Sequence, residues 1–354
     1  MKFVTLLLLG QTLIGLAGEL EDFVSAAKKK HGEVGERAAR FLVDGMPLRD
    51  RETLKKDFLL ENLDLALKAR EEFSWAKEVP EEVFFNDVLP YASLDETRES
   101  WRKEFMDLCR PLVKDCKTTT EATQAINKGI FNIINVHYNT GRKAPNQSPS
   151  ESRKLGMATC TGLSIILVDA CRSVGVPARV AGTALWADKR GNHTWAEIYD
   201  GGEWFFTGSD EYNAKGLNRG WFVNDASKAI ADQWQHAIWA TSWKKTGDHF
   251  PMVWNIRSKD VAAVNVTARY AKKKEAGENE IYLRLWDKKG KGGKRLVGTI
   301  NGSVKTKAGT ADLNDMAVLK AKAGDVIKVT FGEETREVKL PGGKTVDLYW
   351  DQLK

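Results

Sequence analysis

Residue types that together carry out acyl transfer occur within a short stretch of this 354-residue chain. Cys160 begins an apolar run, CTGLSIILVDACRSVGV, which has the length of a helix. His193 begins the alternating run HTWAEIY, and Asp210 and Glu211 follow the strand-like run EWFFT. A thiol at a helix start, an imidazole on a strand and a carboxylate after the next strand can serve as nucleophile, base and orienting acid. The order therefore predicts a cysteine acyl-transfer site.

Each of these residues has a predicted role and a structural alternative. Cys160 is the predicted nucleophile, because a helix N-terminus and a nearby imidazolium both favour a thiolate. Gly162 in the same turn is expected to leave room for a substrate backbone. His193 is predicted to take the thiol proton and to return it to a leaving group. The alternatives are a buried structural cysteine and a surface histidine.

The segments CTGLSIILVDACRSVGVPARVAGT and HTWAEIYDGGEW resemble the cysteine and histidine segments of the transglutaminase-like superfamily, over about residues 118–225. The resemblance implies a papain-like α+β core with a Cys-His-Asp triad, and no metal or organic cofactor. In the superfamily the acid stands four residues after a tryptophan, whereas this chain has Gly208 four residues after Trp204. Asp210 and Glu211 are therefore the two alternatives for the third member of the triad.

The oxyanion of an acyl-transfer reaction needs two hydrogen-bond donors. One is expected to be the backbone N–H of Cys160 at the helix start. The resemblance implies a second donor from a side chain upstream of the cysteine. Gln147 is the candidate for this oxyanion role, and Asn86 is a weaker one.

We expect four segments in an α+β protein. Residues 1–17 have the Lys, the apolar run and the small residues of a signal peptide. Residues 18–117 have helical spacing of apolar positions and predict an N-terminal helical segment. Residues 118–254 are expected to form the transglutaminase-like catalytic core, and residues 255–354 contain about seven short alternating runs that predict an all-β sandwich domain.

Within the core, the pattern predicts secondary structure around the candidate residues. Helices are expected at 118–136, with Thr118–Thr120 as N-caps, and at 161–173, with a stop at Gly175. Strands are expected at 178–186, 194–199 and 203–207. This arrangement would place Cys160 at a helix start and His193 at a strand start.

The predicted signal peptide places the protein outside the cytoplasm, in the periplasm or the extracellular space. Free thiols are uncommon in such oxidising compartments, because cysteines there usually form disulfides. Cys109 and Cys116 flank Pro111, so a disulfide between them and a pair of buried thiols are both open. No segment after the signal peptide is apolar enough to predict a membrane span.

The net charge of +6 is concentrated in the last hundred residues, which contain 21 Lys and Arg and 13 Asp and Glu. A basic C-terminal domain could contact an anionic cell envelope, and the simpler interpretation is a set of solvated hairpin loops. Nucleic acid is not expected as a partner, because aromatic residues do not alternate with the basic runs.

The sequence predicts a secreted thiol-dependent hydrolase or acyltransferase that acts on amide bonds of a protein, peptide or glycopeptide substrate. Hydrolysis and transamidation stay open, since they differ only in whether water or an amine resolves the acyl-enzyme. A weak or inactive binding protein is the alternative, in which the cleft and the many tryptophans between 186 and 243 hold peptide or glycan. In a third possibility the basic β domain acts as a scaffold or adhesin.

Overall fold

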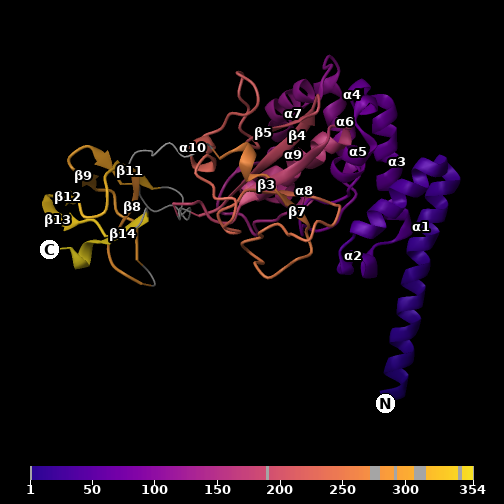
Figure 1. Ribbon diagram of the computed structural model, residues 1–354, viewed down its shortest axis with the longest axis horizontal. Coiled ribbons are helices and arrows are strands. Elements are labelled where there is room, and N and C mark those ends of the chain that lie inside the picture. The colour runs from indigo at the N-terminus through magenta and orange to yellow at the C-terminus, as the bar shows by residue number, and fades with distance from the viewer. Residues whose placement is uncertain are drawn as a thin grey trace. The chain divides into compact units, whose positions relative to one another are not determined.

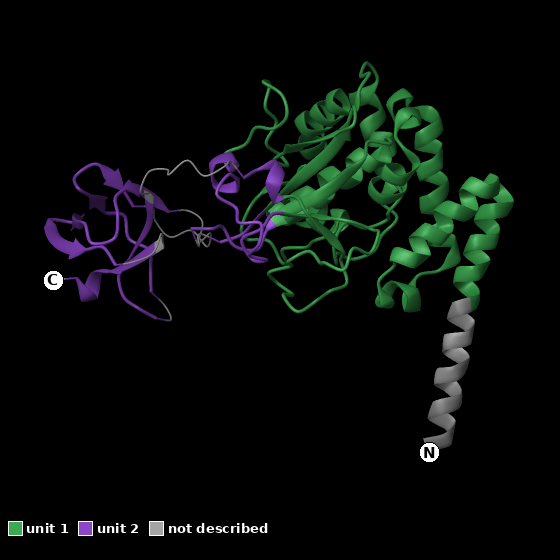
Figure 2. Ribbon diagram, in the orientation of Figure 1, with its two compact units in different colours: residues 1–182, 194–221, 239–266 green, residues 183–193, 222–238, 267–354 purple. Residues whose placement is uncertain are grey.

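The computed structural model describes residues 2–188, 191–271, 280–290, 293–306, 316–341 and 345–353, with residues 2–17, 280 and 345 described by their backbone alone. The predicted signal peptide, residues 1–17, thus lies outside the residues whose side chains are described. Contacts divide the chain into unit 1, residues 1–182, 194–221 and 239–266, and unit 2, residues 183–193, 222–238 and 267–354 (Figure 2). No helix in the described ranges combines the length and apolar character that a membrane crossing requires. The boundaries between the four segments predicted from the sequence remain predictions.

Unit 1 combines helices with a mixed set of strands, so the predicted α+β class is confirmed (Figure 1). Its helices are α1 (Lys2–Gly45), α2 (Leu48–Thr53), α3 (Lys56–Glu72), α4 (Ser74–Glu78), α5 (Glu81–Asp87), α6 (Arg102–Val113), α7 (Thr119–Ile134), α8 (Pro149–Leu155) and α9 (Cys160–Ser173). Its strands are β1 (His137–Tyr138), β2 (Met157–Ala158), β3 (Ala178–Thr183), β4 (His193–Asp200), β5 (Glu203–Thr207), β6 (Trp239–Thr241) and β7 (Ala263–Asn265), of which β3 and β4 each place one end residue in unit 2.

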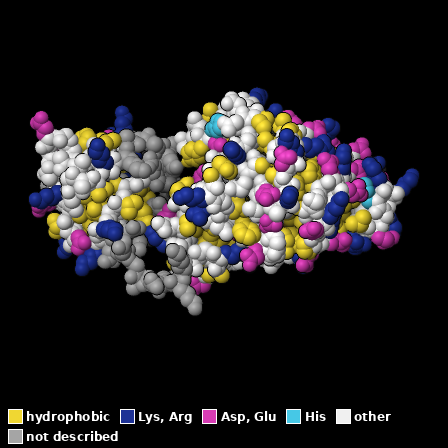
Figure 3. Space-filling view, turned by 90° about the horizontal axis from the view of Figure 1, so that it is seen from above, with side chains coloured by type: hydrophobic (Ala, Val, Ile, Leu, Met, Phe, Trp, Pro, Cys, Tyr) yellow, Lys and Arg dark blue, Asp and Glu magenta, His cyan; other side chains and the backbone are white. Residues whose placement is uncertain are grey.

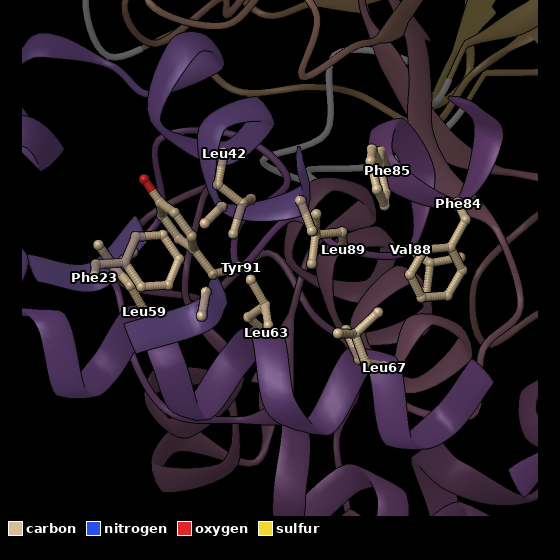
Figure 4. Packing of buried hydrophobic residues seen from close by; sticks show 14 of the residues in the cluster. Phe23, Leu42, Leu59, Leu63, Leu67, Phe84, Phe85, Val88, Leu89 and Tyr91 are labelled. Carbon is tan, nitrogen blue, oxygen red and sulfur yellow. The ribbon is translucent and has the colours of Figure 1, made fainter. Parts of the chain in front are cut away.

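The N-terminal helices bury a hydrophobic core of their own (Figure 4). Leu59, Leu63 and Leu67 recur every four residues in α3 and therefore lie on one face of that helix. This face packs with Phe23 of α1 and Tyr91, and the cluster continues to the end of α5. The predicted helical segment is confirmed, and its periodicity is explained by this core.

Helix α9 is buried along its whole length after Cys160, and α6 and α7 pack against it. It ends as predicted, because Gly175 adopts a φ of 75° and the Val176 N–H donates to Cys171 O at 3.0 Å. Helix α7 also begins as predicted, since the Thr118 hydroxyl accepts a hydrogen bond from the Glu121 N–H. A central helix that is packed on every side fixes the position of its first residue.

A five-stranded sheet in the order β5-β4-β3-β6-β7 completes unit 1. Strands β4 and β5 form a hairpin with Tyr199 opposite Trp204, and Gly201 and Gly202 supply the positive φ angles of its turn. The predicted strands are confirmed, although the first ends at Thr183 and not at residue 186. Two-residue strands β1 and β2 pair in parallel with His137 opposite Met157.

Unit 2 contains the predicted all-β domain as two sheets, with strand orders β10-β9-β12-β13 and β11-β8-β14. Alternating apolar residues from both sheets share one hydrophobic core, which includes Leu283, Ile300 and Val329. The Lys228 ammonium connects residues 222–238 to this domain by donating to the Tyr282 hydroxyl at 2.6 Å. The unit contains α10 (Val223–Ala226), β8 (Glu280–Trp286), β9 (Thr299–Ile300), β10 (Val304–Lys305), β11 (Ala317–Lys320), β12 (Val326–Phe331), β13 (Glu334–Lys339) and β14 (Thr345–Tyr349).

Charged side chains of both signs are interspersed over the face of unit 1 drawn in Figure 3. On the face of unit 2 in the same view, Lys and Arg side chains are scattered singly. Such a distribution is typical of a solvated surface. The expected contact between the basic domain and a cell envelope remains a prediction.

A carboxyl group without a hydrogen-bond partner lies inside unit 1. Asp169 of α9 is fully buried, and neither of its oxygens has a hydrogen-bond partner among the described residues. Burial raises the pKa of this carboxyl well above its ordinary value, and the charge of Glu96 adds to the effect. Asp169 is therefore expected to destabilise the folded protein at neutral pH.

We predict that Asp169→Asn stabilises the protein at pH 8 and has little effect near pH 4. An unfolded Asp loses its proton near pH 4, whereas the folded protein holds the proton more tightly, so wild-type stability falls as pH rises above that value. Each change of one in pKa corresponds to about 1.4 kcal/mol. Thermal unfolding across this pH range measures the difference, and the exposed Asp107→Asn is the control. Lys103 lowers the pKa of Asp107, so the control should lose stability at pH 8; equal behaviour of the two variants would refute the prediction.

Candidate active site

Cys160 is the first residue of α9 and is half-buried, while the rest of that helix is buried. Thr159, at the N-cap, makes no side-chain bond to the first turn. The Thr159 side chain therefore does not occupy the N-terminal amides of α9, which are hydrogen-bond donors at the end of the helix that carries the thiol. A partly accessible cysteine at the positive end of a 14-residue helix has the environment of a nucleophile.

The other cysteines have structural environments. Cys109 and Cys171 are buried, and burial raises the pKa of Cys109 and raises that of Cys171 to about 12. All four thiols are free, so a Cys109–Cys116 disulfide is not present. Within the described residues, no group of three or more His, Cys, Asp or Glu is placed to hold a metal ion.

Gly162 does not leave room for a substrate, and this expectation was wrong. A Cβ atom on Gly162 would lie 2.9 Å from the Ala158 Cβ and 3.5 Å from the Ser152 hydroxyl. The glycine therefore allows α9 to pack closely against β2 and α8. The role of Gly162 is therefore to let the first turn of α9 pack closely against its neighbours.

His193 begins β4 and is buried, so the alternative of a surface histidine does not apply. Its ring centroid lies 4.9 Å from that of Phe222 and 6.2 Å from that of Trp186. The following residue, Thr194, donates from its hydroxyl to the Thr161 hydroxyl at 3.1 Å. That bond joins the residues that directly follow His193 and Cys160.

Gln147 does not have the geometry expected of an oxyanion donor. Its side-chain amide donates to Met157 O at 3.0 Å and to the Ser152 hydroxyl at 3.4 Å, and its oxygen accepts from the Lys143 and Ala144 N–H groups. Both amide hydrogens are thus engaged, and the side chain is buried. The weaker candidate, Asn86, is likewise engaged, since its amide nitrogen donates to Asp87 Oδ2 at 3.1 Å and its oxygen accepts from the backbone N–H groups of Trp243 and Lys244. Sequence could not distinguish a glutamine that shapes a loop from one that faces a substrate.

Asp210 lies against a different histidine. Its Oδ2 is 2.9 Å from Nδ1 of His137, an exposed residue of β1 that the sequence did not single out. Its backbone has a φ of 64°, a conformation that Asp tolerates better than most residues. Asn127 of α7 holds it there, accepting from the Asp210 N–H at 3.0 Å and donating to Gly208 O at 2.9 Å. A buried asparagine on the apolar face of α7 was the available signal for this contact.

Glu211 occupies the space beside Gly208. A Cβ atom on Gly208 would lie 2.5 Å from the Glu211 carboxyl carbon and closer still to Oε2. Glu211 Oε1 accepts a hydrogen bond from the indole N–H of Trp221 at 2.9 Å. Burial raises the pKa of this carboxyl, while the bond from Trp221 acts in the opposite direction and the charge of Asp210 raises it further. The carboxylate of Glu211 therefore lies where a side chain at position 208 would begin.

Comparison with known proteins assigns a class to this part of the chain. Residues 106–208 match the model of the transglutaminase-like superfamily, so the chain contains a transglutaminase-like domain that includes Cys160 and His193. The match ends at Gly208, before Asp210 and Glu211, and is somewhat shorter than the resemblance suggested. No functionally curated protein matches the chain.

Two solved structures are similar to parts of the chain. One is a protein from Cytophaga hutchinsonii described as a candidate cysteine protease, with 20% identity, 33% of this chain and 40% of that chain covered and a TM-score of 0.27. The other is red sea bream transglutaminase, with 9% identity, 80% of this chain and 51% of that chain covered and a TM-score of 0.32.

Proposed function

We propose that the protein is a thiol-dependent hydrolase or acyltransferase that acts on amide bonds. Cys160 is the nucleophile, His193 transfers the proton, and Glu211 orients the histidine. The substrate is a protein, peptide or glycopeptide that is met after export to the periplasm or the extracellular space. The transglutaminase-like domain makes a thiol enzyme the natural class, and the reaction is our proposal.

The hydrogen bond between Thr194 and Thr161 carries the proposal. The side chains of consecutive residues begin close together, because consecutive Cα atoms are about 3.8 Å apart. Joining the residues after Cys160 and His193 therefore favours an encounter between thiol and imidazole.

Glu211 is the better of the two acids for the third role. Asp210 is engaged by His137, whereas Glu211 fills the space beside Gly208, where the superfamily has its acid. A glutamate side chain three residues later thus replaces an aspartate side chain at position 208. With this replacement, the glycine at 208 no longer favours an inactive binding protein.

The reaction would proceed through an acyl-enzyme. The Cys160 thiolate attacks the amide carbonyl carbon, forming a C–S bond, and the carbonyl π electrons move to the oxygen, where the α9 amides stabilise the charge. Collapse breaks the C–N bond, and the His193 imidazolium gives its proton to the leaving amine. In the second half, water or a second amine attacks the thioester carbon and gives a proton to the now neutral His193; the C–S bond then breaks, which releases the acyl product and the Cys160 thiolate.

The first test is the rate of Cys160 alkylation by iodoacetamide against pH, read by mass spectrometry in wild type and His193→Ala. An ordinary thiol is less than about 1% ionised at pH 6, so labelling there should fall roughly 10- to 100-fold when the imidazolium is removed. His137→Ala is the matched control, since this histidine also begins a strand and should leave the rate nearly unchanged. Labelling that does not depend on His193, or that occurs only on unfolding, would exclude the proposed pair.

A further inference from the structure

A charged side chain that the proposed reaction does not use lies beside the start of α9. The Arg142 guanidinium donates from Nε to the Thr159 hydroxyl at 2.6 Å, and Thr159 directly precedes Cys160. Arg142 is half-buried, whereas the next residue, Lys143, is exposed. This bond holds a permanent positive charge next to the proposed nucleophile.

Hydrogen bonds on both sides of Arg142 fix the loop that carries this residue. Before Arg142, the Asn139 N–H donates to Ala158 O at 2.9 Å. After Arg142, the Gln147 side chain accepts from Lys143 N and donates to Met157 O. The loop thus returns to β2 at both ends, and the position of Arg142 is set by backbone contacts that do not involve its charge.

The outer edge of the guanidinium is available. Within the described residues, Arg142 makes one hydrogen bond, the one to Thr159, and no ion pair. The carboxylates that contact the segment after Arg142 are engaged: Glu99 accepts from Ser148 and Ser150, and Glu151 accepts from the Ser148 N–H. A guanidinium that is anchored through Nε keeps its two terminal nitrogens in the fork that matches a carboxylate.

We infer that Arg142 binds a carboxylate of the acyl donor and directs the enzyme to anionic amide substrates. This inference rests on the proposed function and deepens it, because it names the substrate class. Thr159 fixes the guanidinium, and the terminal nitrogens receive the anionic group of a substrate whose scissile carbonyl lies at Cys160. Arg142 acts as a specificity residue and takes no part in bond making.

The carboxylate could be the side chain of an acidic residue or the free terminus of a short peptide. Both present the same two oxygens to a guanidinium fork. The side-chain and the terminal carboxylate differ in the length of chain that separates them from the scissile amide. Two small ligands, one with each kind of carboxylate, therefore distinguish the two sources.

The test compares two reagents at Cys160 in the full-length protein, anionic iodoacetate and neutral iodoacetamide, with the ratio of their rates as the readout. A charge at several ångströms near a protein surface should change the ratio about three- to fivefold. Arg142→Gln is therefore expected to lower the iodoacetate-to-iodoacetamide ratio by that factor, and Arg142→Lys to lower it less. Lys143→Gln, which removes a neighbouring exposed charge, should leave it close to that of the wild type.

A second arm measures protection of Cys160 from iodoacetamide by N-acetylalanine, which has a terminal carboxylate, and by N-acetylglutamate α-methylamide, which has only the side-chain carboxylate. Protection that is lost in Arg142→Gln supports the inference, and the ligand that protects identifies the source. A rate ratio independent of Arg142, or protection by neither ligand, overturns the inference while Cys160 reactivity leaves the proposed function standing. A thiol that reacts with neither reagent in the folded protein overturns both.

Discussion

Replacing Arg102 with methionine is expected to destabilise the protein by about 3–5 kcal/mol, because buried acceptors would lose their donor. The Arg102 guanidinium donates to Asn62 Oδ1, to Arg172 O and to the carbonyls of residues 88, 89 and 90, at 2.9–3.2 Å. It is 2% exposed. Burial and, to a smaller extent, the positive charge of Arg172 lower the pKa of Arg102 to about 9. The side chain therefore stays charged at neutral pH and connects α3, the segment after α5 and the C-terminus of α9.

Arg110→Met on the same helix is the matched control. Arg110 forms partly exposed ion pairs with Glu72 and Asp107, and such pairs contribute about 0–1 kcal/mol. Urea unfolding of both variants gives the comparison. A similar loss in the two proteins would mean that the Arg102 network does not hold α9 in place.

The contrast between these arginines shows what sequence can and cannot predict about the fold. Periodic apolar residues such as Leu59 and Leu63 predicted helices, and alternation predicted the strands around His193, because burial of one face leaves a regular pattern. Arg102 and Arg110 carry the same side chain eight residues apart in one helix. Only the tertiary structure decides that Arg102 meets buried backbone carbonyls and that Arg110 meets partly exposed carboxylates.

The sequence predicted the candidate site to a similar extent as it predicted the fold. Cys160 and His193 could be chosen because each begins an apolar or alternating run, which puts it at the end of an element. The positions of Asp210 and Glu211 follow a strand end, where a single left-handed residue decides which way each carboxylate points. The contacts that engage Gln147 could not be predicted, because they join residues three to ten positions apart in a loop and leave no periodic pattern.

Replacing Glu211 with glutamine is expected to reduce the Cys160 alkylation rate at pH 6–7 by at least about tenfold, and amide-bond activity by about 10²- to 10⁴-fold. The carboxylate holds the imidazole in one tautomer and stabilises the imidazolium, and its loss leaves neither effect. Asp210→Asn should change both rates little, because the Asp210 carboxylate contacts His137. A larger loss for Asp210→Asn than for Glu211→Gln would reverse the assignment.

The pH dependence of the Cys160 alkylation rate distinguishes a positioning role of Glu211 from a purely structural one. Glu211 must be ionised to orient the imidazole, and burial raises its pKa, so reactivity should fall as pH decreases through that raised value. The indole bond from Trp221 lowers the same pKa. Trp221→Phe should therefore raise the pKa further and move the acidic limb to higher pH. Trp254→Phe is the control, because its indole donates to a different carboxylate, Asp95, at 3.0 Å. If both substitutions leave the acidic limb unmoved, Glu211 does not control the titration and the limb belongs to another group.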